Sequence, residues 1–391
     1  MKIALVSPDG LSVLLFCKGI ISALKRIPGV EVVVLSSDGV YKRDIEALGI
    51  RSISIDIYRF ISPVKDIKLL LALVRIFRQE KFDIVINCFT KPNLLGSLAA
   101  KLAKVKKIIL HVNGLGSVFL PNNDIKSRAL RYVTLKLYRL SCSLCNKIWF
   151  TNKNDLAYFM SQNLVSEEKV VLTKFFLDVD YYSSSTVREQ ELSNLRKELD
   201  IDTGDKVVVM VARMIWPKGI KEFVEASNQL KDKFPHLKFL LVAPLESGSP
   251  NSVPEAYVRE QEKCANFRWL GFRRDVKEIY ALSNLAVLPS YYKEGGYPRA
   301  LTEPMAMGKP IITTNTPDCR ETVEEGKNGL LIPVKDSMAL ATAIEELIAD
   351  EHKSLEFGKY SRVKAERDFD EKKIVPQALA ALGFPLPSMN S

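Results

Sequence analysis

The chain of 391 residues is long enough for two domains that each bury a core of their own. Hydrophobic residues make up 47% and charged residues 26%, a composition that excludes extended disorder. No apolar run approaches the roughly 18 residues of a spanning helix. Pro8, Asp9 and Gly10 interrupt the N-terminal apolar stretch where a secretory signal would be continuous. We therefore expect a cytoplasmic protein that does not cross a membrane.

The six cysteines are scattered and do not form the dense framework of a disulfide-stapled domain. Cys142 and Cys145 form a CxxC, but the chain has three histidines and no second cysteine pair at ligand spacing. We expect reduced thiols one helical turn apart at this motif, with no metal and no cofactor.

The net charge of +10 comes from the first half of the chain. Residues 51–150 alone hold 18 basic and 5 acidic side chains, a net +13. In residues 126–147, lysines and arginines alternate with apolar residues in the pattern of a basic amphipathic helix. Either a solvated helix face or attraction to an anionic membrane fits this pattern, with Lys126, Arg128 and Arg131 as membrane-facing candidates. No nucleic-acid-binding signature accompanies it, so nucleic acid is not an expected partner.

Short β-branched apolar runs alternate with stretches of helix length along the first half. This rhythm predicts a parallel sheet covered by helices. The expected strands lie in residues 2–7, 30–36, 50–57, 82–88, 106–112 and 147–152.

A second series of such runs follows a polar, serine-bearing stretch, with expected strands in residues 206–212, 237–243, 267–271, 285–290 and 309–314. We predict two Rossmann-like α/β domains with doubly wound parallel sheets that face each other across a cleft. The expected boundaries are 1–175 for the first domain, 176–205 for a linker and 206–365 for the second domain. A C-terminal helix in 366–391 is expected to pack back on the first domain. Ligands of such sheets bind at the carboxyl ends of the strands.

The loop after residues 206–212 places two cations, Arg213 and Lys218, near the start of an expected helix at Pro217. Positive side chains beside a helix N-terminus form an anion site. Such a site can bind a diphosphate and can stabilise the charge that grows on a leaving phosphate. An unrelated pair of surface cations is the alternative.

A second cluster occupies residues 291–310, YYKEGGYPRALTEPMAMGKP. Gly295 and Gly296 permit a turn that side chains would forbid, and a helix is expected from Pro298. Glu303 on that helix can accept hydrogen bonds from two adjacent sugar hydroxyls, and Glu294 can reach another part of the same ligand.

Three ordered motifs resemble family-4 retaining glycosyltransferases of GT-B fold over essentially the whole chain. They are VARMIWPKG (211–219), PSYYKEGGYPRALTEPMAMGKPIIT (289–313) and EEGKNGLLIPVKD (324–336). The loop HVNGLGSVF (111–119), NLLGSLAAKLAK and LYRLS are similar to PglA-like N-acetylgalactosaminyltransferases, which act on polyprenyl-diphosphate-linked saccharides.

The resemblance implies a role for each donor-side residue. Arg213 and Lys218 hold the donor diphosphate, Glu303 the ribose hydroxyls and Glu294 the transferred sugar. Phe272 and Arg273 border the nucleobase, and Arg299 is an alternative phosphate ligand. Eight residues separate Glu294 from Glu303, one more than is usual in the family, so the place of Glu294 is the less secure.

The first half supplies the acceptor side, with Gly10, His111 and Asn113 as candidates. Asn113 stands where relatives often have histidine or glutamate, and His111 fits a core residue as well as a catalytic one. The expected partners are a nucleotide sugar, with UDP favoured over GDP, a polyprenyl-diphosphate-linked acceptor and the anionic inner face of the cytoplasmic membrane.

The expected reaction is sugar transfer with retention and without a metal, as neither loop shows an Asp-x-Asp motif. A nucleotide-sugar 2-epimerase of the same fold and a sugar-nucleotide-binding module without turnover are the alternatives.

Overall fold

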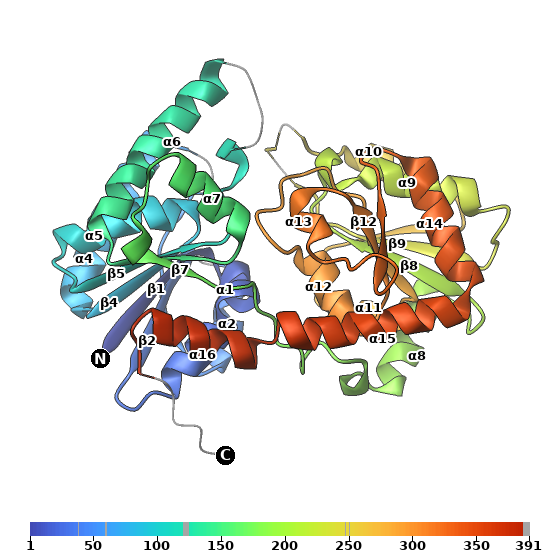
Figure 1. The fold of residues 1–391 in the computed structure, drawn as a ribbon, viewed down its shortest axis with the longest axis horizontal. Helices are drawn as coiled ribbons and strands as arrows, with labels where there is room; N and C mark the ends of the chain where they lie inside the picture. Colours follow the sequence, from blue (N-terminus) through green and yellow to red (C-terminus); the bar gives the residue numbers. More distant parts are fainter. Residues whose placement is uncertain (38, 59–60, 120–124, 247, 250, 386–391) are drawn as a thin grey trace. The chain divides into compact units, whose positions relative to one another are not determined.

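The computed structural model describes residues 1–385 except 38, 59–60, 120–124, 247 and 250 (Figure 1). The chain divides into two compact units. Unit 1 comprises Met1–Phe176 and Glu371–Ser391, and unit 2 comprises Leu177–Asp370. None of the helices described is both long and apolar enough to span a bilayer.

Unit 1 is built on a seven-stranded parallel sheet with the order β3-β2-β1-β4-β5-β6-β7. The order reverses between β1 and β4, which is the point where open parallel sheets bind their ligands. The strands are β1 Lys2–Asp9, β2 Glu31–Ser37, β3 Arg51–Ser54, β4 Ile84–Cys88, β5 Lys107–Val112, β6 Lys147–Phe150 and β7 Val170–Leu172.

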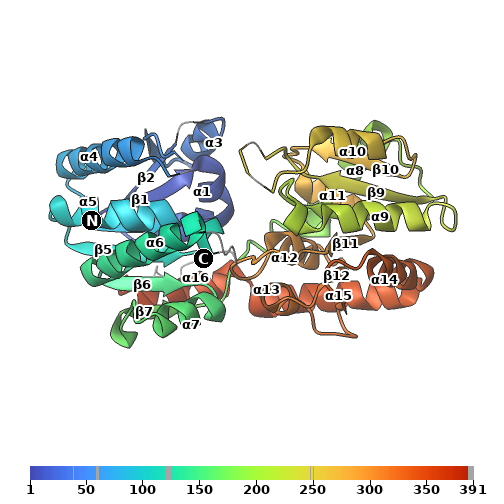
Figure 2. The ribbon, with the colours of Figure 1, turned by 90° about the horizontal axis from the view of Figure 1, so that it is seen from above.

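Two apolar cores cover the two faces of this sheet, because strand side chains alternate between faces. One core includes Cys17, Cys88 and Trp149 and is closed by α2 and α16. The other lies under α4, α5 and α6 (Figure 2). The helices are α1 Gly10–Phe16, α2 Lys18–Lys25, α3 Lys42–Ala47, α4 Pro63–Glu80, α5 Ser97–Leu102, α6 Ile125–Leu144, α7 Lys153–Ser161 and α16 Glu371–Ala381, with a π-helical turn at Pro92–Gly96.

Unit 2 is built on a six-stranded parallel sheet with the order β10-β9-β8-β11-β12-β13. Here the order reverses between β8 and β11, and the two loops that leave these strands carry the sequence motifs described above. The strands are β8 Lys206–Val211, β9 Leu237–Val242, β10 Phe267–Gly271, β11 Leu285–Leu288, β12 Ile311–Thr314 and β13 Gly329–Ile332.

The helices of unit 2 pack in pairs, α9 beside α14, α12 beside α15, and α11 beside α8. Residues 177–205, which we expected to form a linker, belong to this unit and contribute α8. The helices are α8 Glu189–Leu199, α9 Ile220–Leu230, α10 Glu255–Gln261, α11 Val276–Leu282, α12 Arg299–Ala306, α13 Pro317–Arg320, α14 Ser337–Ala349 and α15 Glu351–Asp368.

The parallel α/β fold predicted from the sequence is confirmed for both units, with three local differences. The short strands β7 and β13 were not predicted, because three or four apolar residues carry too little periodicity. Helix α9 begins at Ile220 and not at Pro217, because Trp216–Lys218 form a 3₁₀ turn and Gly219 has a φ of 85°.

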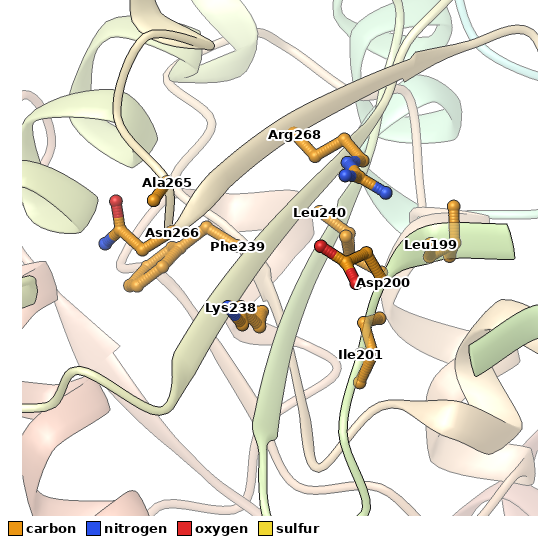
Figure 3. A pocket seen from close by; sticks show the side chains of 9 residues that line it. All are labelled: Leu199, Asp200, Ile201, Lys238, Phe239, Leu240, Ala265, Asn266 and Arg268. Atoms are coloured by element: carbon orange, nitrogen blue, oxygen red, sulfur yellow. The ribbon is translucent and has the colours of Figure 1, made fainter. Parts of the chain in front are cut away.

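Two hollows of unit 2 lie at the end of the sheet away from the loops that follow β8 and β11. The smaller has a volume of about 30 Å³, and Figure 3 shows the side chains that line it, among them Asp200, Lys238, Phe239 and Arg268. A larger hollow of about 200 Å³ lies between residues at the amino ends of β8, β11 and β12, including Lys309, and residues of α14 and α15. Both therefore lie at the amino ends of strands, where parallel sheets do not place their ligands.

Candidate functional site

The loop between β8 and α9 is fixed against the end of β11 by a glycine. Gly219 has a φ of 85°, and a Cβ on it would lie 2.3 Å from the carbonyl oxygen of Pro289. The carbonyl of Pro217 accepts hydrogen bonds from the backbone N–H of Tyr291 at 2.9 Å and from the hydroxyl of Ser290 at 3.3 Å. The backbone around Lys218 is thereby positioned next to the loop that carries Glu294.

Lys218 and Glu294 form a buried ion pair at the carboxyl ends of β8 and β11. The ammonium Nζ of Lys218 donates a hydrogen bond to Oε2 of Glu294, and their side chains are 11% and 6% exposed. The other carboxylate oxygen, Oε1, accepts a hydrogen bond of 2.6 Å from the hydroxyl of Ser290. The ammonium group of Lys218 is thus held in a fixed position. An anionic ligand can bind it by displacing the carboxylate of Glu294.

Arg213 and Lys218 lie over the same aromatic ring. The guanidinium carbon of Arg213 and the Nζ of Lys218 are each 5.1 Å from the centroid of Tyr292. Arg213 also lies 3.7 Å from a carboxylate oxygen of Glu246, a long ion pair, and its side chain is 37% exposed. Two cations and a ring at the N-terminus of α9 form a site suited to an anion.

The glycine turn that follows Glu294 takes backbone conformations that side chains rarely adopt. Gly295 and Gly296 have φ values of 75° and 118°. The N–H of Gly295 donates a hydrogen bond of 2.9 Å to Asp318, a buried residue at the start of α13. The turn begins directly after Glu294, whose carboxylate lies beside Lys218.

Glu303 is held by two donors in the interior of unit 2. Its Oε1 accepts hydrogen bonds from Nε of Arg299 at 2.7 Å and from the hydroxyl of Tyr182 at 3.0 Å. Burial and the neighbouring carboxylate raise the pKa of Tyr182, so the phenol stays protonated and donates. The side chains of Arg299 and Glu303 are 14% and 7% exposed. The carboxylate orientation is therefore set before any ligand binds.

Phe272 and Arg273 follow β10 and differ in their surroundings. Phe272 is 48% exposed, and an exposed aromatic face offers a surface on which a flat ring can stack. Arg273 forms ion pairs with Glu198 and Asp275, and hydrogen bonds to these carboxylates raise its pKa. Arg273 thus connects its loop to α8 through Glu198 and also pairs with Asp275 within the loop.

The three acceptor-side candidates of unit 1 have different surroundings. Gly10 is buried where a Cβ would lie 2.8 Å from that of Tyr41, so the glycine permits close packing of α1. His111 is fully buried, and burial lowers its pKa to about 3. Of the two alternatives for His111, a core residue or an acceptor-side residue, its burial favours the core. Asn113 is half-buried, and its amide oxygen accepts from Thr151 at 3.3 Å.

Helix α6 carries the basic segment, and its outer face combines charge with apolar groups. Lys126 and Arg128 are exposed, whereas Arg131 is half-buried and donates to the carbonyl of Val118 at 3.4 Å. The exposed apolar side chains on the helix are Ile125, Tyr132, Val133, Leu137 and Leu140.

Three residues of the site were not predicted from the sequence. Tyr182 lies in the segment that we expected to be a linker, and nothing in its neighbourhood signals a bond to Glu303. Asp318 follows β12 in the loop NTPDCRE, where an acidic residue at a helix start is a weak signal. Tyr292 lies inside the second motif, where an aromatic residue next to a predicted anion site could have indicated cation–π contact.

Two Rossmann-like units, the second with Arg213 and Lys218 in the loop after β8 and Glu294 in the loop after β11, match the architecture of nucleotide-sugar enzymes of GT-B fold. The family model "Glycosyl transferases group 1" matches residues 193–364, and "Glycosyl transferase 4-like" matches residues 2–152. The chain belongs to the group 1, or family 4, glycosyltransferases.

Curated relatives extend over most of the chain. It is 29% identical over 380 residues, 97% of each chain, to N,N'-diacetylbacillosaminyl-diphospho-undecaprenol alpha-1,3-N-acetylgalactosaminyltransferase of Campylobacter jejuni. It is 26% identical over 295 residues, 75% of this chain and 73% of the relative, to UDP-Gal:alpha-D-GlcNAc-diphosphoundecaprenol alpha-1,3-galactosyltransferase of Escherichia coli. The fold is similar to that of Anabaena Alr3699/HepE in complex with UDP-glucose, with a TM-score of 0.77, 21% identity and coverage of 98% and 99%.

Proposed function

We propose that this glycosyltransferase moves a sugar, an N-acetylhexosamine in the first instance, from a UDP-sugar to a polyprenyl-diphosphate-linked saccharide, with retention of anomeric configuration. The observation that carries the proposal is the placement of Arg213 and Lys218 over one ring at the N-terminus of α9. The names of the two curated relatives, both of which describe transfer to diphospho-undecaprenol-linked sugars, support the acceptor class.

The chemistry follows from the charge that develops when the glycosidic bond breaks. The leaving UDP gains negative charge on its β-phosphate, and donors that are already aimed at that point stabilise the transition state. Lys218 supplies a buried ammonium, Arg213 a second cation, and the helix α9 its N-terminal amides. Because these cations are side chains, the transfer proceeds without a divalent ion at the donor phosphates.

The two glutamates take separate parts of the donor. Glu303, oriented by Arg299 and Tyr182, accepts hydrogen bonds from the ribose hydroxyls. When the donor binds, its diphosphate takes the place of Glu294 as the partner of Lys218. The freed carboxylate of Glu294 then contacts the transferred sugar. The exposed ring of Phe272 stacks on the nucleobase. Retention is then a front-face transfer in which the departing phosphate accepts the proton of the acceptor hydroxyl.

Unit 1 supplies the acceptor side, and its basic helix docks the enzyme on the cytoplasmic face of the membrane. A bilayer-resident polyprenyl diphosphate must be met at the lipid surface. Helix α6 exposes Lys126, Arg128, Lys136 and Arg139 beside Tyr132, Val133 and Leu137. This combination of cations with apolar groups favours adsorption to an anionic interface.

A donor and acceptor screen tests the proposal. UDP-, GDP- and dTDP-sugars are first compared by thermal shift, since a bound donor stabilises the folded state by mass action. The stabilising donor is then incubated with short polyprenyl-diphosphate-linked saccharides. We expect stabilisation by a UDP-sugar and a lipid-linked product extended by one sugar. Transfer from GDP- or dTDP-sugars only, or no transfer to any diphosphate-linked lipid, would contradict the proposal.

A nucleotide-sugar 2-epimerase is the second candidate, because that class also grips a nucleotide sugar with a two-domain fold. It requires acid and base groups at the sugar, and the single histidine among the acceptor-side candidates is fully buried. Incubation with UDP-N-acetylglucosamine without an acceptor separates the two classes. Epimerised sugar would establish the second candidate, whereas the transferase leaves the configuration at C2 unchanged.

A further inference from the structure

Three soft or borderline metal-binding side chains meet inside unit 1, away from the donor motifs. Cys17 separates α1 from α2, Cys88 ends β4, and His111 lies on β5. All three are fully buried, and their ligand atoms lie within 4.8 Å of one another. The cluster joins segments that are 71 and 23 residues apart in sequence.

Two of the three separations are close to the edges of a zinc coordination tetrahedron. The Sγ atoms of Cys17 and Cys88 are 3.6 Å apart, and Sγ of Cys88 is 3.7 Å from Nδ1 of His111. With Zn–S of about 2.3 Å and Zn–N of about 2.0–2.1 Å, a tetrahedral ion separates two sulfurs by about 3.8 Å and a sulfur from a nitrogen by about 3.5 Å.

The histidine ring presents the correct atom to the two thiols. The amide Nδ2 of Asn113, which can only donate, lies 3.4 Å from the same Nδ1. Nδ1 is thus the ring nitrogen on the side of the Cys88 thiol, and Nε2 has no hydrogen-bond partner among the residues described. Stacking on Trp149, with centroids 3.9 Å apart and planes at 12°, fixes the ring.

We propose that Cys17, Cys88 and His111 bind one structural zinc ion in the core of unit 1. Two Zn–S bonds and one Zn–N bond form, and the two thiol protons leave to solvent. Two thiolates and a neutral imidazole around Zn²⁺ carry no net charge, which suits an apolar core. Monovalent copper with the same ligands would leave an uncompensated negative charge there.

Asn113 is placed to provide the fourth ligand. Rotation of its amide by 180° exchanges Nδ2 for Oδ1 and puts an oxygen at the position now 3.4 Å from Nδ1. The hydroxyl of Thr151, which donates to Oδ1 at 3.3 Å, can then accept from Nδ2. Zinc would tie the α1–α2 junction to β4, β5 and the loop after β5.

The test is zinc content and coordination of the full chain, produced in zinc-supplemented medium under reducing conditions and freed of loose metal by gel filtration. We expect about one zinc per chain and an X-ray absorption shell with two sulfurs at about 2.3 Å. The double variant Cys17→Ala, Cys88→Ala should lose at least tenfold in bound zinc. The matched control is Cys142→Ala, Cys145→Ala, which removes another buried cysteine pair and should keep the metal.

Several results would overturn the site, and the unmodified chain alone can give them. They are bound zinc below a tenth of an equivalent, a coordination shell without sulfur, or a Cys17–Cys88 disulfide in the reduced preparation. Equal zinc retention by the double variant and its control would also overturn it. None of these outcomes bears on donor binding in unit 2, so the proposed transferase activity is judged separately.

Discussion

Lys218 and Glu294, which are 76 residues apart in sequence, share a buried hydrogen bond at the carboxyl ends of two neighbouring strands. The positive charge that we assign to the donor diphosphate is therefore already compensated in the free protein. Removing one member of such a pair leaves the other charge buried and unpaired, which typically costs about 3–5 kcal/mol. Binding and stability thus depend on the same two side chains.

Replacing Lys218 should remove most of the transferase activity. Lys218→Met keeps the apolar length of the side chain and deletes the charge, and we expect kcat to fall by about 10²–10³, as for loss of one preorganised donor. Steady-state kinetics with the UDP-sugar measures this. Lys221→Met is the control, because Lys221 is 60% exposed and pairs with Glu225 on α9. Full turnover by Lys218→Met would refute the phosphate role.

Tyr182 should act through Glu303 and affect donor affinity more than turnover. Tyr182→Phe deletes the hydroxyl that donates to the carboxylate at 3.0 Å. Hydrogen bonds to charged groups contribute about 1.5–3 kcal/mol, so we expect KM for the donor to rise about tenfold or more with kcat changed less than threefold. Tyr181→Phe is the neighbouring control. A tenfold fall in kcat with an unchanged KM for the donor would argue against a positioning role.

Gly219 should be irreplaceable for steric reasons. In Gly219→Ala the new Cβ meets the carbonyl of Pro289 at 2.3 Å and the φ of 85° is strained, so we expect a loss of about 2 kcal/mol or more in unfolding free energy. Gly271→Ala isolates the backbone cost, because its φ is 62° and nothing lies within 4 Å of the new Cβ. Denaturant unfolding of both variants measures the difference, and similar losses would contradict the close approach.

Glu324 should make unit 2 sensitive to acid. Hydrogen bonds from Tyr360 and Arg367 lower its pKa from 4.5 to about 2. As the pH falls, Glu324 is therefore protonated in the unfolded chain before it is protonated in the folded protein. The stabilisation of the folded state by the ionised Glu324 is complete above pH 4.5 and is lost as the pH falls towards 2. We expect Glu324→Gln to cost about 2 kcal/mol at pH 7 and little at pH 2.5. The adjacent Glu325→Gln is the control, and a pH-independent loss would contradict the assignment.

Membrane docking should depend on the position of the cations and not on net charge alone. Each cation near an anionic surface contributes about 1 kcal/mol to binding. The double variant Lys126→Glu, Arg128→Glu should therefore bind anionic vesicles at least about 30-fold more weakly, as measured by sedimentation. The control, Lys263→Glu with Lys359→Glu, changes net charge equally at exposed positions of unit 2. Equal weakening by both pairs, or no binding by the unchanged protein, would refute docking through α6.

The sequence was most informative where a pattern is local. Alternating apolar runs predicted the longer strands, and the spacing of Arg213 and Lys218 around Pro217 predicted an anion site, because a strand, a turn and a helix start lie within a few residues. Contacts between distant segments could not be predicted in this way. The approach of Tyr182 to Glu303, 121 residues away, depends on tertiary packing and has no local signature.

The same limit applies to the core of unit 1. His111 was an open choice between core and acceptor surface, because alternation along β5 does not say which face of a parallel sheet a polar residue will meet. Cys17 and Cys88 showed no ligand spacing, since they are 71 residues apart and meet only in the folded unit, where β1 pairs with β4.

The configuration at the new glycosidic bond shows whether the enzyme transfers the sugar with retention. The enzyme is incubated with an α-linked UDP-N-acetylhexosamine and a polyprenyl-diphosphate-linked saccharide, without added Mg²⁺ or Mn²⁺. The coupling constant of the anomeric proton in the product is then measured by NMR. We expect an α-linked product that forms as fast without an added divalent ion as with one. Lys218→Met should form almost none of this product. A β-linked product, or transfer that requires an added divalent ion, would contradict this expectation.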